Sequence, residues 1–259
     1  MTVTSRARLL LDRISVYGPM VEVACSVLSE RPIATEELRS LMCPGQEEDT
    51  AAELMPFLLD SGLVERARGR LRLASAYNQR WSAQINLLAL LHGRADVNYA
   101  FRFIWEELLD RAEWAGTFLD RDSVWPVINQ VPVPGASLPH LNANRMASWM
   151  RLASWIGLIQ PERSNSFVLL PTAELLLSLL NATLTVDDES SMIDWVSSVE
   201  SQFCRVTTNP GTLHPGFSSA LSILAARGCL EFTTYSDEHL YQIGPSRVTH
   251  ITLRKGIAA

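Results

Sequence analysis

One pattern occurs three times along this chain: an apolar helical run ends at a glycine, and two short strand-like stretches follow it. The glycines are Gly62, Gly157 and Gly228. Glycine adopts the left-handed backbone conformation that ends a helix without the steric penalty of a Cβ atom. The residues after each glycine are apolar or β-prone, and polar turn residues separate the two stretches. The sequence therefore predicts a helix followed by a β-hairpin at three places.

Each hairpin is expected to pair a strand directly after the glycine with a second strand a few residues later. The expected pairs are 63–65 with 70–73, 158–160 with 167–170, and 229–231 with 240–243. The unequal spacing of the three glycines argues against a regular solenoid. A helix, a glycine stop and a hairpin together are typical of the C-terminal half of a winged helix.

The segment before the first hairpin predicts the N-terminal half of the same unit. Residues 19–29 indicate a helix, residues 31–33 a connecting strand, and residues 35–42 a second helix with a capping-box-like start. The inward side chains expected in the first of these helices are Val21, Val23, Ala24 and Leu28.

A helical segment is expected between the first two copies, because apolar residues recur there at spacings of three and four. They are Trp81, Ile85, Leu88 and Leu91, followed by Phe101, Ile104, Leu108 and Ala112. We expect these side chains to belong to the core and not to a cofactor site.

The predicted fold class is mainly α with small β-hairpins: tandem winged-helix (α+β) units joined by a helical segment. The expected boundaries are 1–76 for unit 1, 77–120 for the helical connector, 121–184 for unit 2 and 185–259 for unit 3. Two winged-helix units, or another α+β arrangement with a glycine after each helix, are the alternatives.

Charge and composition restrict the function further. The chain has 259 residues, a formal net charge of -6 and a pI of about 5.4. Proteins that depend on non-specific phosphate contacts are usually basic, so any contact with DNA must come from a local patch. The cysteines and histidines are scattered without zinc-binding spacing. No apolar run reaches the ~20 residues of a membrane span, so we expect a cytoplasmic protein with no membrane partner.

The helix before each hairpin is the element that enters the major groove in a DNA-binding winged helix, and the hairpin tip often meets phosphate. In the first copy this helix, residues 47–60, carries five acidic and no basic residues, and Pro56 is expected to kink or shorten it. In the third copy, residues 215–227 carry one charge and small outward side chains, which suits packing against protein.

The second copy gives the best candidate for reading DNA, the helix over residues 142–152. Asn142 is a good N-cap, and Asn and Arg are the side chains that pair bidentately with adenine and guanine edges. Four arginines also crowd the first hairpin, where they could grip phosphates or balance the acidic helix beside them. The candidate DNA-binding residues are Asn142, Asn144, Arg145, Ser148 and Arg151 on the helix, and Arg66, Arg68, Arg70 and Arg72 on the hairpin.

Catalytic motifs are not found in the sequence: it has no dinucleotide fingerprint, P-loop, nucleophile elbow or zinc-protease motif. The acidic run 187–189 precedes a helix, so loop solvation and the helix dipole explain it. His214 has no evident Cys or Asp partner nearby in sequence. We therefore expect a protein that is not an enzyme, with no catalytic residue, metal or cofactor.

Two parts of the chain resemble the DpdG proteins, which are accessory components of bacterial clusters that insert 7-deazaguanine bases into DNA and restrict foreign DNA. The first part is residues 36–42 (EELRSLM) leading to 59–65 (LDSGLVE). The second is residues 141–145 (LNANR) leading to 155–159 (WIGLI) and 169–173 (LLPTA). The resemblance implies an anti-phage role beside a helicase-like or nuclease partner. The kleisin-associated tandem winged-helix subunits of bacterial chromosome-organising complexes are similar too, although they have two units.

Two functions follow as hypotheses. The first is a non-enzymatic interaction or adaptor subunit of a DNA-processing or anti-phage defence complex, with protein partners and with DNA as an optional further partner. The second is a sequence-specific DNA-binding transcriptional regulator that uses the helix around residues 142–152.

Overall fold

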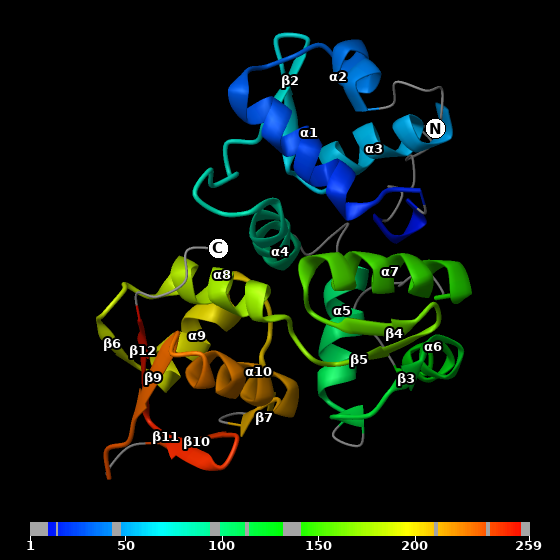
Figure 1. Ribbon diagram of the computed structural model, residues 1–259. Coiled ribbons are helices and arrows are strands. Elements are labelled where there is room, and N and C mark those ends of the chain that lie inside the picture. The colour runs from blue at the N-terminus through cyan, green and yellow to red at the C-terminus, as the bar shows by residue number, and fades with distance from the viewer. Residues whose placement is uncertain are drawn as a thin grey trace, which may run out of the picture.

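The computed structural model describes residues 10–13, 15–42, 48–93, 99–111, 114–131, 141–209, 212–236 and 239–254 (Figure 1). Over these residues the chain is mixed α and β, with many helices and small antiparallel sheets of two or three strands. The expectation of a mainly helical chain with small hairpins is confirmed at this level. None of the helices in the described ranges is long and apolar enough to cross a membrane.

The first group of elements follows a short 3-10 helix, η1 (Leu10–Asp12). Its members are α1 (Gly18–Glu30), α2 (Thr35–Met42), α3 (Glu48–Asp60), β1 (Val64–Ala67) and β2 (Arg70–Leu73). The β1 and β2 strands form an antiparallel hairpin, and Ile33 adds an antiparallel bridge to Leu71. The connecting strand expected between the first two helices is therefore present as a single bridge on the hairpin.

Burial in α1 follows the helical period, with Val21, Ala24, Cys25 and Leu28 inside. Val23 was expected inside, but this prediction is wrong, because the side chain is 52% exposed. Two residues from Val21 correspond to about 200° around a helix, which turns Val23 to the opposite face. Of the two effects expected of Pro56, shortening of the helix is wrong, since α3 continues through Pro56, and a kink there stays a prediction.

The second group repeats this order of elements. After α4 (Ala83–Gly93), its members are α5 (Tyr99–Leu109), β3 (Leu119–Asp120), α6 (Arg121–Ile128), α7 (Ala143–Ile156), β4 (Gln160–Arg163) and β5 (Ser166–Val168). The three strands form one antiparallel sheet in the order β3-β5-β4. Because β3 pairs with β5, the sheet begins just before the expected unit boundary at residue 121. The unit boundaries themselves stay a prediction.

The third group adds two hairpins to the same order. Its helices are α8 (Ala173–Thr183), α9 (Met192–Gln202) and α10 (Pro215–Ala226), and its strands are β6 (Glu189–Ser191), β7 (Thr207–Asn209), β8 (Thr212–Leu213), β9 (Leu230–Thr233), β10 (Tyr241–Ile243), β11 (Ser246–Val248) and β12 (His250–Leu253). The main sheet has the order β6-β12-β9, while β7-β8 and β10-β11 are separate two-stranded hairpins.

The expected third hairpin is wrong in its pairing. The segment 240–243 does contain the strand β10, but β10 pairs with β11, and the partner of β9 is β12. The inserted hairpin is attached to α10: Ser218 Oγ donates to the carbonyl of Gln242 at 3.0 Å and accepts from the amide of Gly244 at 3.0 Å. These contacts join residues that are far apart in sequence. The pairing of the strands therefore cannot be predicted from the strand propensity of each segment alone.

The three helix stops are confirmed. Gly62, Gly157 and Gly228 have φ angles of 80°, 95° and 75°, all in the left-handed region that favours glycine. Gly157 has a second constraint, because a Cβ atom there would lie 2.5 Å from Oγ1 of Thr172. The hydroxyl of Thr172 accepts from the amide of Leu175 and caps α8. The same side chain therefore lies at the end of α7 and at the beginning of α8.

The core is shared among the three groups. Figure 1 shows α4 between them, and this helix packs against α1, α5, α7, α8 and α9. The indole of Trp105 in α5 donates to the carbonyl of Arg205 at 2.9 Å, and its ring meets Phe217 of α10 edge to face. The segment expected as a helical connector thus supplies a central part of the core. Ala112, expected in its apolar stripe, lies outside the described residues.

Candidate interaction surface

Residues 10–13 and 15–17, here called the N-terminal strap, hold α3 and α7 together. Asp12 accepts from Nε of Arg145 on α7 at 2.7 Å, and Arg13 donates to Asp60 on α3 at 2.7 Å. The amide and hydroxyl of Ser15 donate to one carboxylate oxygen of Glu53 on α3 at 2.8 and 2.6 Å. The strap therefore bonds both to the helix that precedes the first hairpin and to the helix that precedes the second.

The predicted DNA-reading face of α7 is occupied in part by these contacts. Asn142 caps the helix as expected, accepting from the amide of Arg145 at 2.9 Å. Ser148 was expected outward, but it is buried at 6% exposure, and its hydroxyl accepts from Arg151 at 3.2 Å. Asn144 is exposed, so the five candidates on α7 do not form one open polar face.

The four arginines of the β1–β2 hairpin are all exposed, but they do not converge. Arg68 is at the turn, in a left-handed conformation with φ of 50°. Arg70 and Arg72 alternate with buried Leu71 along β2, whereas Arg66 faces Leu71 across the ladder. Arg72 forms an ion pair with Glu65 at 2.6 Å, so part of the positive charge is balanced within the hairpin.

The helices that precede the other two hairpins are also engaged. In α3, Glu53 and Asp60 bind the strap. The remaining acidic residues expected on this helix, at positions 47–49, have side chains outside the described residues. In α10, Ser218 is bonded to the β10–β11 hairpin. Its exposed positions include Ser219 and Ile223, the latter 44% exposed.

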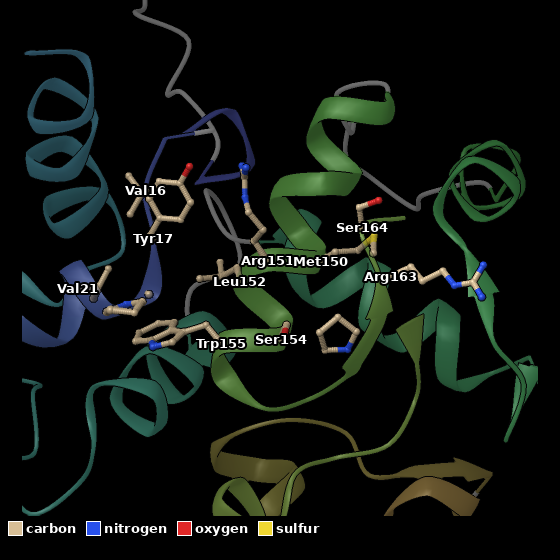
Figure 2. Close-up of a pocket in the computed structure, with 13 residues that line it drawn as sticks. Val16, Tyr17, Val21, Met150, Arg151, Leu152, Ser154, Trp155, Arg163 and Ser164 are labelled. Atoms are coloured by element: carbon tan, nitrogen blue, oxygen red, sulfur yellow. The ribbon is translucent and has the colours of Figure 1, made fainter. Parts of the chain in front are cut away.

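A pocket of about 350 Å³ lies where α1, α7 and the β4–β5 hairpin meet (Figure 2). We call it the α1–α7 groove. Its walls are Val16, Tyr17, Gly18, Pro19 and Val21 from the strap and α1, Met150, Arg151, Leu152, Ser154 and Trp155 from α7, and Pro161, Arg163 and Ser164 from the hairpin.

Trp155 forms the part of the groove next to α1. A Cβ atom on Gly18 would lie 1.9 Å from Cγ of this indole, so the ring packs directly on the glycine backbone. The indole nitrogen donates to a carboxylate oxygen of Glu22 at 2.6 Å, and Gln84 of α4 donates to the same oxygen. The orientation of the ring is therefore fixed by both packing and a hydrogen bond.

Arginines supply the charge of the groove. Among the described residues that line it, the charged ones are Arg151 and Arg163. The guanidinium of Arg151 lies 5.8 Å from the ring centre of Tyr17, a cation–π contact, and Tyr17 is 53% exposed. Figure 2 shows Arg151 extending beside Tyr17 and Arg163 extending in another direction. Sequence reasoning singled out Arg151 but not Tyr17, Gly18 or Trp155.

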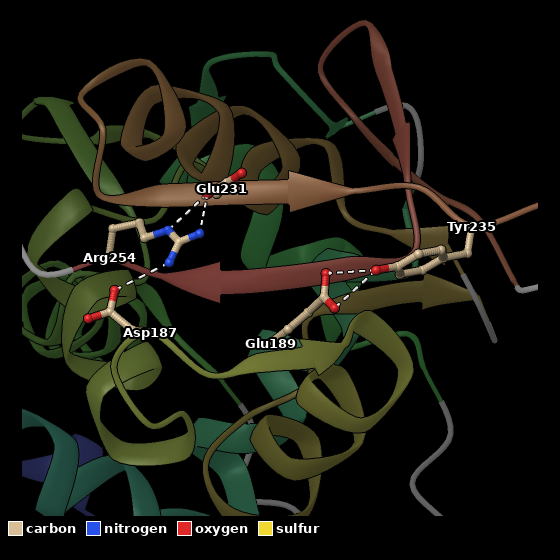
Figure 3. Close-up of polar contacts among 5 residues, drawn as sticks. All are labelled: Asp187, Glu189, Glu231, Tyr235 and Arg254. Carbon is tan, nitrogen blue, oxygen red and sulfur yellow. Dashed lines mark hydrogen bonds and ion pairs between the residues drawn. The ribbon is translucent and has the colours of Figure 1, made fainter.

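The acidic run at residues 187–189 is partly paired with side chains on the third sheet (Figure 3). Arg254 donates to Glu231 at 2.9 Å and to Asp187 at 3.4 Å, and the hydroxyl of Tyr235 donates to Glu189 at 3.2 Å. The three residues of the run are nevertheless exposed, as expected of a solvated segment. Ser191 caps α9.

Buried titratable groups lie away from the groove. Burial raises the pKa of the Cys25 thiol to about 12 and raises that of Cys204 further, so both thiols stay protonated and unreactive. Burial lowers the pKa of His214 to about 4, and its Nδ1 accepts from the amide of Gly216 at 3.1 Å. Within the described ranges, no group of three His, Cys, Asp or Glu side chains is placed to hold a metal ion. Cys43 lies outside those ranges.

No family model, no curated protein and no solved structure matches this chain.

Proposed function

We propose that this protein is a non-enzymatic interaction subunit, built from winged-helix units, of a cytoplasmic DNA-processing or anti-phage defence complex. The order of elements supports the architecture. The second group has the order helix, strand, helix, helix, strand, strand, as α5-β3-α6-α7-β4-β5. Its three strands form a sheet in the order β3-β5-β4. The third group follows the same order with two inserted hairpins, and the first group uses the bridge at Ile33 as its first strand.

The observation that carries the functional proposal is the engagement of the helices that would enter DNA. Asp12 binds Arg145 on α7, Glu53 on α3 accepts from Ser15, and the β10–β11 hairpin is bonded to Ser218 on α10. A helix whose outward side chains are bonded within the chain is poorly suited to reading base edges. The net charge of -6 also disfavours broad phosphate binding. Protein partners fit these features better.

Purification from the native host tests this proposal. The protein would carry a tag at its chromosomal locus, and gentle lysis and mild cross-linking would precede capture. We expect the same partner proteins in constant ratio in repeated preparations, with and without nuclease treatment. Recovery of the chain alone in every preparation contradicts an interaction subunit. Partners that are lost on nuclease treatment show that DNA, not protein contact, links them.

A sequence-specific DNA-binding regulator is the second candidate, because Asn144 and the hairpin arginines remain exposed. It requires the strap to leave α7, which would expose Arg145. The test is an anisotropy titration with duplex DNA at two salt concentrations. This candidate predicts that Arg145→Ala and Arg151→Ala each weaken binding by about 1–3 kcal/mol. Absence of specific binding in both salts removes it.

A further inference from the structure

The α1–α7 groove has the composition of a protein-binding hot spot. Aromatic residues, Met and Arg are enriched where binding energy concentrates in protein interfaces, and here Tyr17, Met150, Arg151 and Trp155 line one pocket. The volume of about 350 Å³ is enough for one or two large side chains.

The indole of Trp155, here called the floor of the groove, is already held in position within the chain itself. Trp155 rests on the backbone of Gly18 and is held through its ring nitrogen by Glu22. A ring already fixed in place loses little conformational freedom on binding, so more of the contact energy appears as affinity. This favours an occupant that places an apolar side chain against the indole.

The charged residues of the groove determine which residues can flank the apolar side chain of that occupant. Arg151 and Arg163 are exposed, and they are the charged residues among the described lining of the groove. A carboxylate near either guanidinium gains a complementary contact, whereas a lysine is repelled. The two arginines extend in different directions from the pocket, so carboxylates on both sides of the apolar residue match them (Figure 2).

We propose that the α1–α7 groove binds a short segment of a partner protein in which a bulky apolar side chain lies between acidic residues. The apolar side chain packs on Trp155 and Tyr17, and the acidic residues pair with Arg151 and Arg163. The inference rests on the proposed function as an interaction subunit and specifies the chemistry of its partner.

Nucleic acid fits the same groove less well. Interfaces with DNA are polar and strongly positive, and much of their binding comes from phosphate contacts. The accessible part of the walls is largely apolar, through Val16, Pro19, Leu152, Trp155 and Pro161. A nucleotide would leave most of that apolar surface without a matching partner, whereas a peptide side chain covers it.

Fluorescence anisotropy with defined peptides tests the proposal on the full-length chain. One fluorescein-labelled peptide has the sequence Glu-Glu-Leu-Trp-Leu-Glu-Glu, and its matched control replaces the four glutamates by lysines. We expect saturable binding of the glutamate peptide, at least about tenfold tighter than that of the lysine peptide. A photoreactive group on the central residue is expected to label Tyr17 or Met150.

Charge-reversal variants then test whether Arg151 and Arg163 cause the preference for the glutamate peptide over the lysine peptide. Arg151→Glu and Arg163→Glu together are expected to weaken the glutamate peptide by about tenfold or more and to strengthen the lysine peptide. Arg227→Glu changes the net charge in the same direction at an exposed site outside the groove, and it should alter neither affinity. Circular dichroism of each variant checks that the fold is retained.

Three results would overturn the inference: no binding of the glutamate peptide, equal binding of both peptides, or a charge reversal that changes nothing beyond the Arg227→Glu control. A labelled duplex DNA that binds through Arg151 and Arg163, while the glutamate peptide does not compete, would assign the groove to nucleic acid and also contradict it. If the native complex is recovered but the peptide fails, the interaction role stands and this groove is not its docking site. If the peptide binds but no complex is recovered, the proposed function fails instead.

Discussion

Arg145 and Asp12 are 133 positions apart in the sequence, yet Nε of the arginine lies 2.7 Å from a carboxylate oxygen of the aspartate. The pair joins η1 to α7, and its side chains are 23% and 28% exposed. Arg145 was one of the candidate DNA-binding residues, and in the folded chain it is committed to an internal ion pair. The same contact explains why the outward face of α7 is less accessible than its sequence indicates.

A double-mutant cycle measures this contact. Asp12→Ala and Arg145→Ala are each expected to lower the free energy of unfolding by about 1 kcal/mol, with a coupling energy near 1 kcal/mol, because the pair is partly shielded from water. Urea denaturation of the two single variants and the double variant gives the three values. Strictly additive effects would show that the two side chains do not interact in solution.

The Gly18→Ala variant tests the packing under the groove. The new Cβ atom would lie 1.9 Å from Cγ of Trp155, so the indole or the first turn of α1 must move. We expect a loss of about 1–3 kcal/mol in the free energy of unfolding, the usual cost of overpacking. Urea denaturation measures the loss, and a shift in tryptophan emission reports the moved ring.

Gly93→Ala is the matched control, since a Cβ atom on Gly93 meets nothing within 4 Å. Alanine is also the better residue at a helix end without a left-handed turn, so this variant is expected to be neutral or slightly more stable. If both variants behaved alike, the close approach of Trp155 to α1 would be refuted.

The sequence predicted the features that depend on neighbouring residues. The left-handed stops at Gly62, Gly157 and Gly228 and the cap at Asn142 follow from local backbone preference, and the structure confirms them.

Features that depend on distant contacts were missed. Ser148 is buried although its helical position indicates an outward side chain, and β9 pairs with β12 across an inserted hairpin. The groove could not be predicted either, because Gly18 and Trp155 meet only after two groups of helices have packed together. A single sequence carries no periodic signal for such a meeting. The signal that was available was the Gly-Pro at the start of α1, typical of a helix N-terminus.

Comparing Arg254→Ala with Ile251→Ala separates the contribution of surface ion pairs to stability from that of buried packing on the third sheet. Its ion pairs with Glu231 and Asp187 are exposed at both ends, and exposed pairs add little stability because water screens them. We expect an unchanged urea midpoint. Ile251→Ala, in the strand β12 that directly precedes Arg254 but with 0% exposure, is expected to lose about 2–5 kcal/mol. A larger loss for Arg254→Ala than for Ile251→Ala would contradict this account.

Burial of His214 predicts a dependence of stability on pH. Its pKa falls from the ordinary 6.5 to about 4 in the folded chain, so between these values the unfolded chain binds a proton that the folded chain does not. The free energy of unfolding therefore decreases as the pH falls through this window. The decrease begins near pH 6.5 and reaches about 3 kcal/mol below pH 4. Urea midpoints at pH 7.5, 6, 5 and 4 measure it.

Replacing the histidine isolates this contribution from that of the carboxylates. His214→Asn keeps an acceptor for the amide of Gly216 at the start of α10 but removes the titrating ring. Its stability should therefore fall less steeply than that of the wild type between pH 6.5 and 4. An identical slope in His214→Asn and the wild type would mean that the ring takes up its proton as readily when folded as when unfolded. The buried, neutral state assigned to His214 would then be incorrect.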